Sequence, residues 1–434
     1  MSGKEVDALD QKVSDAINST LSGKYERKQA VGRGAYGQVW LVKRLSDNVN
    51  CVAKVMAVDK MHRYEQEVQC LARCDHLNIV RLVDTFQSSI GPIIILDYAD
   101  GGDLSHFVKN HIQAHKNQLL SEELVGSIFV QLVLAIHHIH TKRMMHRDIK
   151  SANVLMLTNG LVKVSDFGFS RQFDNTVSQD VADTFLGTPY YLAPELWKRQ
   201  KYSKKADIWS LGIVLYELMT LKRPFVSSSM RGLMNAIISG EFEKPSSSQY
   251  GDELRQVLSA MLIVDPHKRP STADVLNTPV MRRLVDKLKS DIANNSKLSA
   301  KDKDDFAKMI SEQMNNLSSA ETLNAVNADE EETVAEKVRL EGPVMIGSVK
   351  EWKPRYVVLN DDALVVTRVK EDRRSQQLPL TTILNVQPAE PAAGAEHVLI
   401  VSLDTGYTVW IKAADDAERD KWISEIQTAK AAKK

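Results

Sequence analysis

The sequence predicts an α+β protein: a bilobal unit with a β-rich N-lobe and an α-rich C-lobe, then a β-barrel or sandwich with a C-terminal helix. Three observations support this prediction. Residues 25–58 alternate apolar and polar positions among several glycines, which is typical of strands and turns. From residue 103 to about 289, apolar residues recur at helical spacing. Strand-like segments return after residue 338.

Composition and charge indicate a globular protein and exclude two classes. The 56 Lys and Arg residues balance 56 Asp and Glu residues, and 43% of all 434 residues are apolar. A disordered chain would be poorer in apolar residues and more one-sidedly charged. A protein held on nucleic acid by bulk charge would be basic, so we expect no nucleic-acid partner. Any phosphate-bearing ligand therefore needs a specific site.

The N-terminal residues and the cysteines predict a cytoplasmic protein, with the nucleus as the alternative. The segment MSGKEVDALDQKVSDA lacks the apolar core of a signal peptide. No apolar run approaches the roughly 18–20 residues of a transmembrane segment. Three cysteines are too few for a disulfide framework, so we expect reduced thiols. Cys70 and Cys74 lie four residues apart, but no further ligand stands at zinc spacing.

The elements of the bilobal unit are predicted in a fixed order. A polar N-terminal arm or short helix precedes three strands, one helix and a pair of strands, and a short joint leads to the helical lobe. The predicted ranges are 1–24 for the arm, 25–58 for the three strands, 60–74 for the helix, 79–86 and 93–96 for the strand pair, and 97–102 for the joint.

The predicted domain boundaries follow changes in composition. Residues 290–335 lose their apolar residues and end in four consecutive acids, which predicts a solvated linker, although DDFAKMISEQM is compatible with one helix. After it, strands such as WKPRYVVLN and HVLIVSLD precede an amphipathic helix with Trp422, Ile423 and Ile426 on its apolar face. The predicted domains are a 1–24 extension, a 25–284 bilobal unit, a 285–335 linker and a 336–434 C-terminal domain.

A glycine-rich segment, GRGAYGQV at residues 32–39, stands between the first two predicted strands. Glycines let backbone N–H groups close over a triphosphate. The alternative is a hairpin without a ligand. A strand at residues 51–55 follows, rather than the βαβ unit of a dinucleotide site.

Lys54 lies within that apolar strand, where a lysine has to be paired or directed outward. Glu65 and Glu67 both lie on the predicted helix that follows, and the offsets to the apolar residues after it favour Glu67 as the partner. Such a pair would hold Lys54 against the phosphates of a nucleotide. The alternative is a surface lysine at the end of a strand.

The segment HRDIKSAN at residues 146–153 places an acid, a base and an amide in one loop. Asp148 can accept the proton of an attacking hydroxyl, and Lys150 can neutralise charge on a transferred phosphoryl group. Asn153 offers an oxygen to a hard cation such as Mg²⁺. Asp166, in the Asp-Phe-Gly that follows, can bind the same metal.

In this order, the motifs resemble the signature set of eukaryotic protein kinases over residues 25–284. The resemblance implies the bilobal protein kinase fold, ATP and Mg²⁺, and phosphoryl transfer to protein substrates. It also implies an ion pair between Glu195 and Arg269 and an anchoring role for Asp207. The implied nucleotide-binding residues are Val31, Gly32, Gly34, Gly37, Val39, Val52, Lys54, Leu96, Asp97, Ala99 and Leu155.

Lys150 and the Gly-Thr-Pro at residues 187–189 resemble serine/threonine kinases rather than tyrosine kinases. The segments DTFLGTPYYLAPE and DYADGGDL are similar to the NIMA-related (Nek) group, which implies cell-cycle, cytoskeletal or flagellar basal-body roles. Arg147 precedes Asp148, and phosphorylated Thr184 would supply an anion for it. We therefore expect Thr184 to be an activating phosphosite. The alternative is that Thr184 is a solvated loop residue.

The C-terminal segment WKPRYVVL and the final helix resemble the pleckstrin-homology (PH) fold, so that the whole chain is similar to NIMA-related kinases of trypanosomatids with such a domain. Phosphoinositide-binding members use a first-strand Lys and a K-x-R on the second strand. Lys353 and Arg355 match the second part, but Ile346 stands at the first-strand position, with Lys350 nearby. Acids also crowd the domain, which favours a partner protein over a phosphoinositide membrane.

The function predicted from these motifs is a serine/threonine protein kinase that uses ATP and Mg²⁺, with Asp148, Lys150, Lys54 and Glu67 as catalytic residues and Asn153 and Asp166 as metal ligands. The PH-like domain would regulate it, or would bring it to the cytoskeleton or a membrane. The alternative is a catalytically weak scaffold with a kinase fold that presents the PH-like domain.

Overall fold

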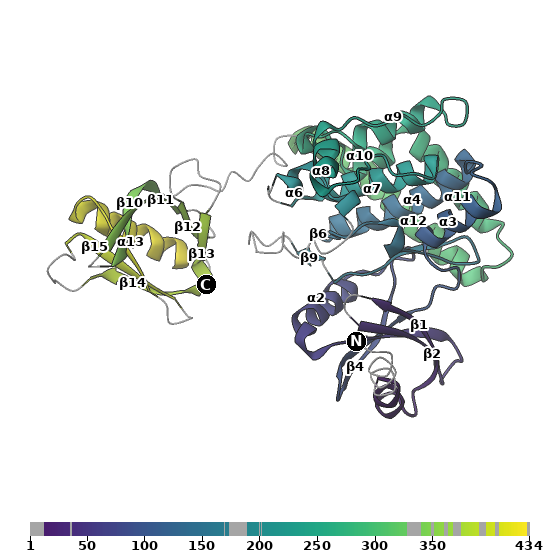
Figure 1. Ribbon diagram of the computed structural model, residues 1–434, viewed down its shortest axis with the longest axis horizontal. Helices are drawn as coiled ribbons and strands as arrows, with labels where there is room; N and C mark the ends of the chain where they lie inside the picture. The colour runs from purple at the N-terminus through teal and green to yellow at the C-terminus, as the bar shows by residue number, and fades with distance from the viewer. Residues whose placement is uncertain are drawn as a thin grey trace. The chain divides into compact units, whose positions relative to one another are not determined.

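The computed structural model describes a chain of two compact units, Met1–Ala320 and Glu321–Lys434 (Figure 1). Each unit has its own hydrophobic core. The first is bilobal and the second is a β domain with a terminal helix, so the predicted fold class is confirmed. The described residues are 13–34, 37–168, 170–172, 189–198, 200, 202–327, 340–348, 351–359, 363–367, 375–389, 396–403 and 408–431.

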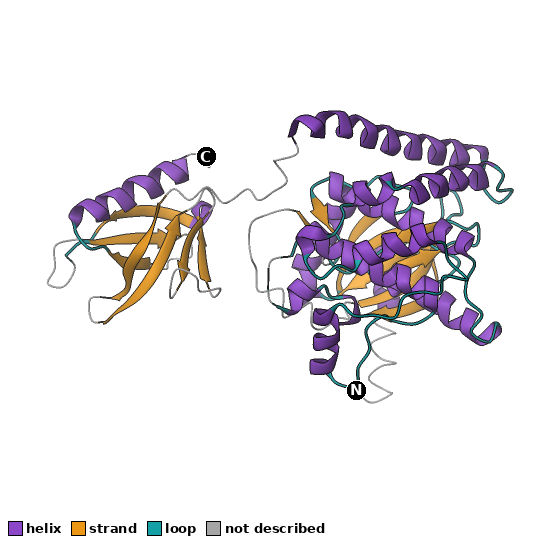
Figure 2. Cartoon of the chain, turned by 90° about the horizontal axis from the view of Figure 1, so that it is seen from above, coloured by secondary structure: helices purple, strands orange, loops and turns teal. Residues whose placement is uncertain are grey.

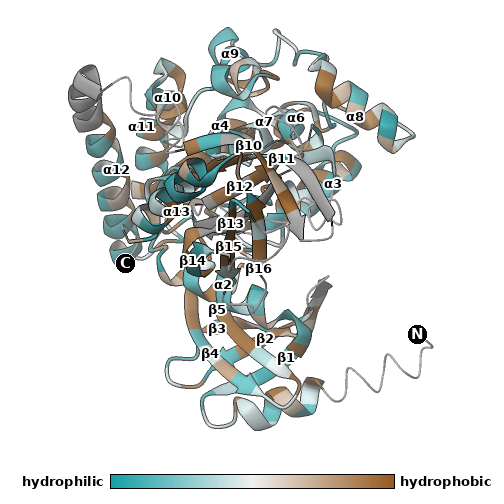
Figure 3. Cartoon of the chain, turned by 90° about the vertical axis from the view of Figure 1, so that its left-hand side faces the viewer, coloured by the Kyte–Doolittle hydropathy of each residue, from teal (hydrophilic) through white to brown (hydrophobic). Residues whose placement is uncertain are grey.

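The small lobe is an antiparallel sheet in the order β1-β2-β3-β5-β4. Alternate residues of strand β5 pack into two different hydrophobic cores. Ile93 and Ile95 pack with a helix at 13–20, whereas Ile94 and Leu96 join the cluster that contains helix α2. Figure 3 shows hydrophobic residues, in brown, along the strands of this sheet. The bounds are β1 (Tyr25–Gly34), β2 (Gly37–Arg44), β3 (Asn50–Met56), α2 (Met61–Ala72), β4 (Leu82–Ser88) and β5 (Gly91–Asp97).

The joint between the lobes is tied to strand β7 (Val154–Met156) of the helical lobe. The N–H of Gly101 donates to the carbonyl of Met156 at 2.9 Å, and the N–H of Met156 donates to the carbonyl of Gly102 at 2.8 Å. A Cβ on Gly101 would lie 2.8 Å from the Met156 carbonyl oxygen, so this approach requires glycine.

The helical lobe is built around α4 and α7, most of whose residues are buried. Among the described residues, α4 is the one helix long and apolar enough to cross a membrane, but 78% of its most apolar stretch is buried in the protein, as in a soluble core. The expectation that no apolar run approaches the length of a transmembrane segment is therefore wrong for α4. The helices are α3 (Leu104–Ala114), α4 (Glu122–Thr141), α6 (Pro194–Trp197), α7 (Lys204–Thr220), α8 (Met230–Ser239), α9 (Asp252–Met261), α10 (Thr272–Asn277), α11 (Pro279–Ala293) and α12 (Ala300–Asn327).

The structure differs from the sequence prediction over residues 285–317, which were expected to begin a solvated linker. They form the end of α11 and most of α12, and both helices bury apolar side chains in the core of the first unit. Phe306, Ile310 and Leu317 are each at most 4% exposed. The prediction failed because these few apolar residues are diluted by charged neighbours, although their spacing places them on one face of a helix.

The second unit is a curled antiparallel sheet in the order β13-β12-β11-β10-β16-β15-β14, crossed by helix α13 (Figure 2). Trp422, Ile426 and Ala429 of α13 are buried against this sheet. Of the three residues predicted for its apolar face, Trp422 and Ile426 are buried and Ile423 is partly buried. The bounds are β10 (Leu340–Ser348), β11 (Glu351–Leu359), β12 (Ala363–Thr367), β13 (Ser375–Pro379), β14 (Ile383–Pro388), β15 (Val398–Leu403), β16 (Thr408–Lys412) and α13 (Asp416–Ala431).

A buried ion pair between Glu195 and Arg269 holds α6 against the loop after α9, as the resemblance to kinases implied. Two guanidinium nitrogens each lie 2.7 Å from a carboxylate oxygen. The guanidinium also donates to the carbonyls of Ile263, Lys205 and Val264. Because both side chains are almost fully buried, either charge alone would be costly.

We predict that Glu195→Gln lowers the free energy of unfolding by about 3–5 kcal/mol, because it leaves the Arg269 charge buried without its carboxylate. Urea denaturation measures this loss. The control is Glu253→Gln, which breaks an ion pair to Arg283 whose side chains are 50% and 62% exposed, and which should cost less than about 1 kcal/mol. Equal losses in the two variants would contradict the prediction.

Candidate active site

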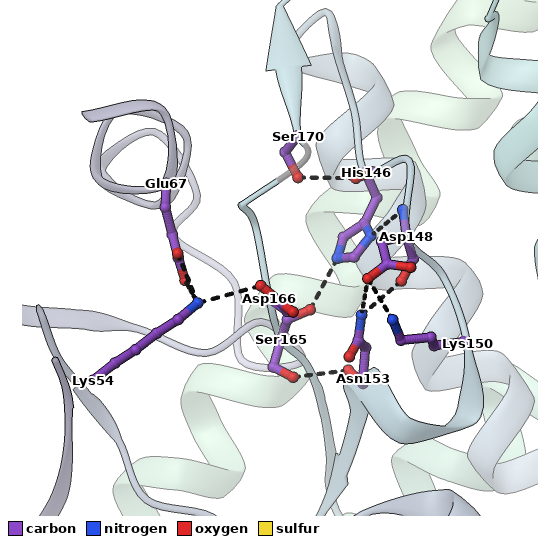
Figure 4. A network of polar contacts seen from close by, with 9 residues as sticks. All are labelled: Lys54, Glu67, His146, Asp148, Lys150, Asn153, Ser165, Asp166 and Ser170. Atoms are coloured by element: carbon purple, nitrogen blue, oxygen red, sulfur yellow. Dashed lines mark hydrogen bonds and ion pairs between the residues drawn. The ribbon is translucent and has the colours of Figure 1, made fainter. Parts of the chain in front are cut away.

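Lys54 meets two carboxylates where the lobes face each other (Figure 4). Its Nζ on β3 lies 2.7 Å from both carboxylate oxygens of Glu67 on α2 and 3.3 Å from Oδ1 of Asp166. Glu67 is buried and Glu65 is exposed, in agreement with the choice of Glu67 from the sequence. Burial opposes the charged form of Lys54, but the two carboxylates outweigh it and raise the pKa of this lysine. The lysine is therefore held as a cation.

The loop after α4 brings Asp148, Lys150 and Asn153 together. Oδ2 of Asp148 accepts hydrogen bonds from Lys150 Nζ at 2.7 Å and from Asn153 Nδ2 at 2.8 Å. Asn153 Nδ2 also donates to the backbone carbonyl of Asp148 at 2.8 Å. Burial raises the pKa of the Asp148 carboxyl above its usual range, although Lys150 opposes the shift. A higher pKa makes this carboxylate a better proton acceptor.

His146 joins this loop to the Asp-Phe-Gly segment. Its Nδ1 accepts from the N–H of Asp148, so Nε2 carries the proton and donates to the carbonyl of Ser165 at 3.1 Å. Ser165 in turn donates from its N–H and its hydroxyl to the carbonyl of Asn153. Phe167 packs its ring edge-on against His146, with the centroids 5.0 Å apart. Ser165 was not singled out from the sequence, where no signal marks it.

Asp207 of α7 holds the loop backbone from beneath, as expected from the resemblance. Its carboxylate is fully buried and accepts from the N–H groups of His146 and Arg147, both at 3.0 Å. His140 and the hydroxyl of Tyr202 supply two more donors, each at 2.9 Å. Burial opposes ionisation of Asp207, but these hydrogen bonds prevail and lower its pKa. Sequence reasoning missed Tyr202, because only the fold brings it close.

The predicted nucleotide-binding residues come from both lobes. In the small lobe, β1 pairs with β2 so that Gly32 faces Val39 and Gly34 faces Gly37. A Cβ on Gly37 would lie 1.8 Å from the carbonyl oxygen of Val55, so the close approach of β3 requires glycine there. The Gly-rich hairpin is therefore packed directly on the strand of Lys54. Its tip, residues 35–36, lies outside the described residues.

The remaining predicted nucleotide residues lie on β3, β5, the joint and β7. Val52 pairs with Leu96 across β3 and β5, and Leu155 lies on β7, next to the joint that contains Ala99. The side chain of Asp97 accepts from Lys163 Nζ at 3.2 Å and from Arg81 at 3.4 Å, so it is turned toward other protein groups. The side chain of Val31, on β1, is half exposed.

The donor set fits a magnesium ion shared with a nucleotide. The Asp166 carboxylate and the Asn153 side-chain oxygen are hard ligands, and Asn153 directs its nitrogen to Asp148, which leaves the oxygen as its cation-facing atom. Among the described residues, no three His, Cys, Asp or Glu side chains gather as a metal site. Two protein ligands suit Mg²⁺, which usually completes its coordination with phosphates and water.

Other predicted site residues remain apart from this cluster. Thr184 and Lys350 lie outside the described residues. Arg355 is partly buried on β11 of the second unit, where Ile346 pairs with Lys353 and Val344 with Arg355. The register therefore sets an apolar residue opposite each basic residue of the K-x-R pair.

Comparison with known proteins agrees with this geometry. The protein kinase domain family matches residues 25–281, and the PH domain family matches residues 338–431. Two Trypanosoma brucei brucei proteins, whose names describe serine/threonine-protein kinases A and B, are 35% and 34% identical over 93% of this chain and 94% of their own lengths. The serine/threonine-protein kinase Nek1 of Mus musculus is 39% identical over 62% of this chain and 22% of its own length.

Nek5 of Homo sapiens is likewise 39% identical, over 61% of this chain and 37% of its own length. The two Nek matches are about as long as the kinase family match, whereas the two trypanosome matches are long enough to include most of the chain that follows it. The chain therefore belongs to the protein kinase family, as a serine/threonine kinase of the NIMA-related type with a C-terminal PH domain.

Proposed function

We propose that this kinase transfers the γ-phosphoryl group of ATP to serine or threonine hydroxyls of proteins, with Asp148 as the proton acceptor. One observation carries the proposal: Lys54, Glu67 and Asp166 meet within one cluster, and Asp148, Lys150 and Asn153 within a second, joined to it through Ser165 and His146 (Figure 4). Phosphoryl transfer needs positioning and charge neutralisation more than covalent chemistry, and these groups provide both.

Asp148 and Lys150 act on the acceptor side. The substrate hydroxyl gives its proton to Asp148 as its oxygen bonds to the γ-phosphorus and the bond to the departing ADP breaks. Lys150, 2.7 Å from the same carboxylate, keeps a positive charge beside the transferred group. Asn153 fixes the Asp148 carboxylate in place through Nδ2.

Lys54, Glu67 and Asp166 act on the nucleotide side. Glu67 holds Lys54 toward the α- and β-phosphates, while Val39, Val52, Leu96 and Leu155 enclose the adenine, and the backbone of Asp97 and Ala99 meets its edge. Asn153 and Asp166 would hold Mg²⁺, which when bound neutralises charge on the phosphates. The scaffold alternative is less well supported, because every one of these chemical groups is present.

We predict that Asp148→Asn lowers kcat for a peptide substrate by about 10²–10⁴-fold, because the amide cannot accept the proton. Asp166→Asn should also lose most activity, because it removes the proposed metal ligand. Transfer of radioactive phosphate from γ-labelled ATP measures both. The control is Asp286→Asn, at an exposed position of α11, which should match wild type. Equal signals from all four proteins would indicate a contaminating kinase and favour the scaffold.

We further propose that phosphorylation of Thr184 activates the kinase through Arg147. The backbone of Arg147 is held by Asp207, at a φ of 69°. Its guanidinium lies over the ring of Tyr202, 5.2 Å from the centroid. A phosphate would therefore meet a cation whose position is already fixed, directly before Asp148.

We predict that Thr184→Ala lowers kcat/KM by about 10- to 100-fold, because the loop then lacks its anion. Kinetics on the purified variant measure this loss. Thr176→Ala, in the same segment, is the control and should leave activity unchanged. In an Arg147→Ala background, Thr184→Ala should cause no further loss. Unchanged turnover in the Thr184→Ala variant would disprove the switch.

For the PH domain, we propose a protein partner that regulates or localises the kinase in the cytoplasm. The register supports this proposal over a phosphoinositide membrane, because Ile346, not a lysine, stands opposite Lys353. Arg355 lies on the same face of β11 as the fully buried Val357 and Leu359 and is itself partly buried. Two basic residues contribute only about 2 kcal/mol of attraction to an anionic membrane.

We predict that liposomes with and without phosphoinositides sediment the protein equally, because the domain lacks an excess of basic residues around Lys353 and Arg355. A Lys353→Ala/Arg355→Ala variant should behave like wild type in both assays. Sedimentation that requires phosphoinositides and is lost in the variant would show that lipid binding is the function of this domain.

A further inference from the structure

Helix α12 (Ala300–Asn327) begins 19 residues after the kinase family match ends at residue 281 and ends before the PH match begins at residue 338. It nevertheless packs on the helical lobe. Phe306, Ile310 and Leu317 lie at intervals of four and seven residues, so they share one face of the helix. All three belong to the main core cluster of the kinase unit. Figure 3 shows the alternation of hydrophobic and hydrophilic residues along α12.

One polar side chain of α12 reaches a particular loop of the kinase unit. Gln313 Oε1 lies 3.3 Å from Nε2 of His76, and Gln313 Nε2 donates to the carbonyl of Leu134 on α4 at 3.2 Å. The N–H of Asn78 donates to His76 Nδ1, so His76 Nε2 carries the proton and donates to Gln313. Burial, followed by the neighbouring His138, lowers the pKa of His76 to about 3, which keeps the ring neutral.

His76 lies in the loop that follows α2, the helix that carries Glu67. The opposite side of this loop is already fixed to β8 (Val162–Val164). The N–H of Val80 donates to the carbonyl of Val164, and the N–H of Val164 donates to the carbonyl of Asn78. The Asn78 side chain adds bonds to Gln131 and to the carbonyl of Val162. Because this loop is fixed to the helical lobe, any rotation of α2 would use the loop as its pivot, and Gln313 adds a contact there at His76.

Apolar side chains of α2, of this pivot and of α12 belong to one hydrophobic core. Leu71 of α2 is buried in the same cluster as Ile310, and Cys74, at the beginning of the loop, belongs to it as well. A movement of α2 that separates Glu67 from Lys54 would have to turn about this pivot. Contacts that fix the pivot therefore favour the arrangement in which the two charges are 2.7 Å apart.

We propose that α12 is a positioning element of the catalytic unit, in which Gln313, through His76, holds the loop after α2 and thereby keeps Glu67 against Lys54. This inference rests on the proposed role of the Lys54–Glu67 pair in binding the nucleotide phosphates. Gln313 is a positioning residue, because it touches neither substrate nor reacting atoms. The segment expected to be a linker is then a part of the kinase that tunes its affinity for ATP.

A double-mutant cycle on the full chain tests the proposal. The dissociation constant of Mg·ATP is measured by calorimetry for wild type, Gln313→Ala, Glu67→Gln and the double variant. We expect Gln313→Ala to weaken ATP binding about fivefold, equivalent to one neutral hydrogen bond, with no change in KM for the peptide. In the Glu67→Gln background the same substitution should have no further effect, because its consequence passes through Glu67.

The control is Glu312→Ala, an adjacent exposed residue of α12 that pairs only loosely with Lys308 at 4.0 Å. It should leave ATP affinity at the wild-type value.

A second pair of variants tests docking of the whole helix. Ile310→Asp places a charge in the core and should weaken ATP binding by more than fivefold, whereas Ser311→Asp, at the next and exposed position, should not.

The outcomes separate the two proposals. If Glu67→Gln leaves ATP affinity unchanged, the assigned role of the ion pair is wrong, and the inference falls with it. If Glu67→Gln weakens binding but Gln313→Ala has no effect, or weakens it equally in both backgrounds, the ion pair stands and α12 only stabilises the fold. Because Gln313→Ala removes no core contact, a failure of Ile310→Asp to fold leaves the test intact.

Discussion

The catalytic loop depends on one buried carboxylate, that of Asp207. Arg147 has a φ of 69°, a conformation that a residue with a Cβ adopts only at an energetic cost. Asp207 stabilises it by accepting the N–H groups of His146 and Arg147, while His140 and Tyr202 satisfy its remaining lone pairs. A buried charge with four donors is stable where an unpaired one would not be. The position of Asp148 follows from this arrangement.

A series of hydrogen bonds leads from the loop held by Asp207 toward the small lobe. His146 holds Ser165, Ser165 holds Asn153, and Asp166, next to Ser165, reaches Lys54 on β3. Lys54 is in turn held by Glu67, so charges from both lobes meet in one place. The overall charge of the chain is zero. In the proposed function, a highly charged nucleotide is bound by a few placed groups in a partly buried site, where electrostatic interactions are stronger than in water.

The sequence predicted those features whose partners are marked by motifs. Motifs predicted two ion pairs, Lys54–Glu67 and Glu195–Arg269, and the loop at 146–153, because the chemistry of each position requires that residue type. The strands of both units were predicted from the alternation of apolar and polar residues. The sequence allowed a short helix before residue 24 and one helix within residues 290–335. It did not predict that they are buried, because their apolar residues are few and only the partner surface shows the burial. Tyr202 and Ser165 form contacts that no local pattern signals.

Gln313 gives α12 a directional contact that its apolar face does not supply. Its apolar face supplies most of the attraction to the core, but apolar contacts are not directional, and a helix can slide along them. Gln313 fixes the position. A shift of one turn, about 5.4 Å, would leave the N–H of His76 and the amide of Gln313 buried without these partners. An unsatisfied buried polar group costs about 1–3 kcal/mol. A single glutamine therefore selects one register out of several that the apolar pattern allows.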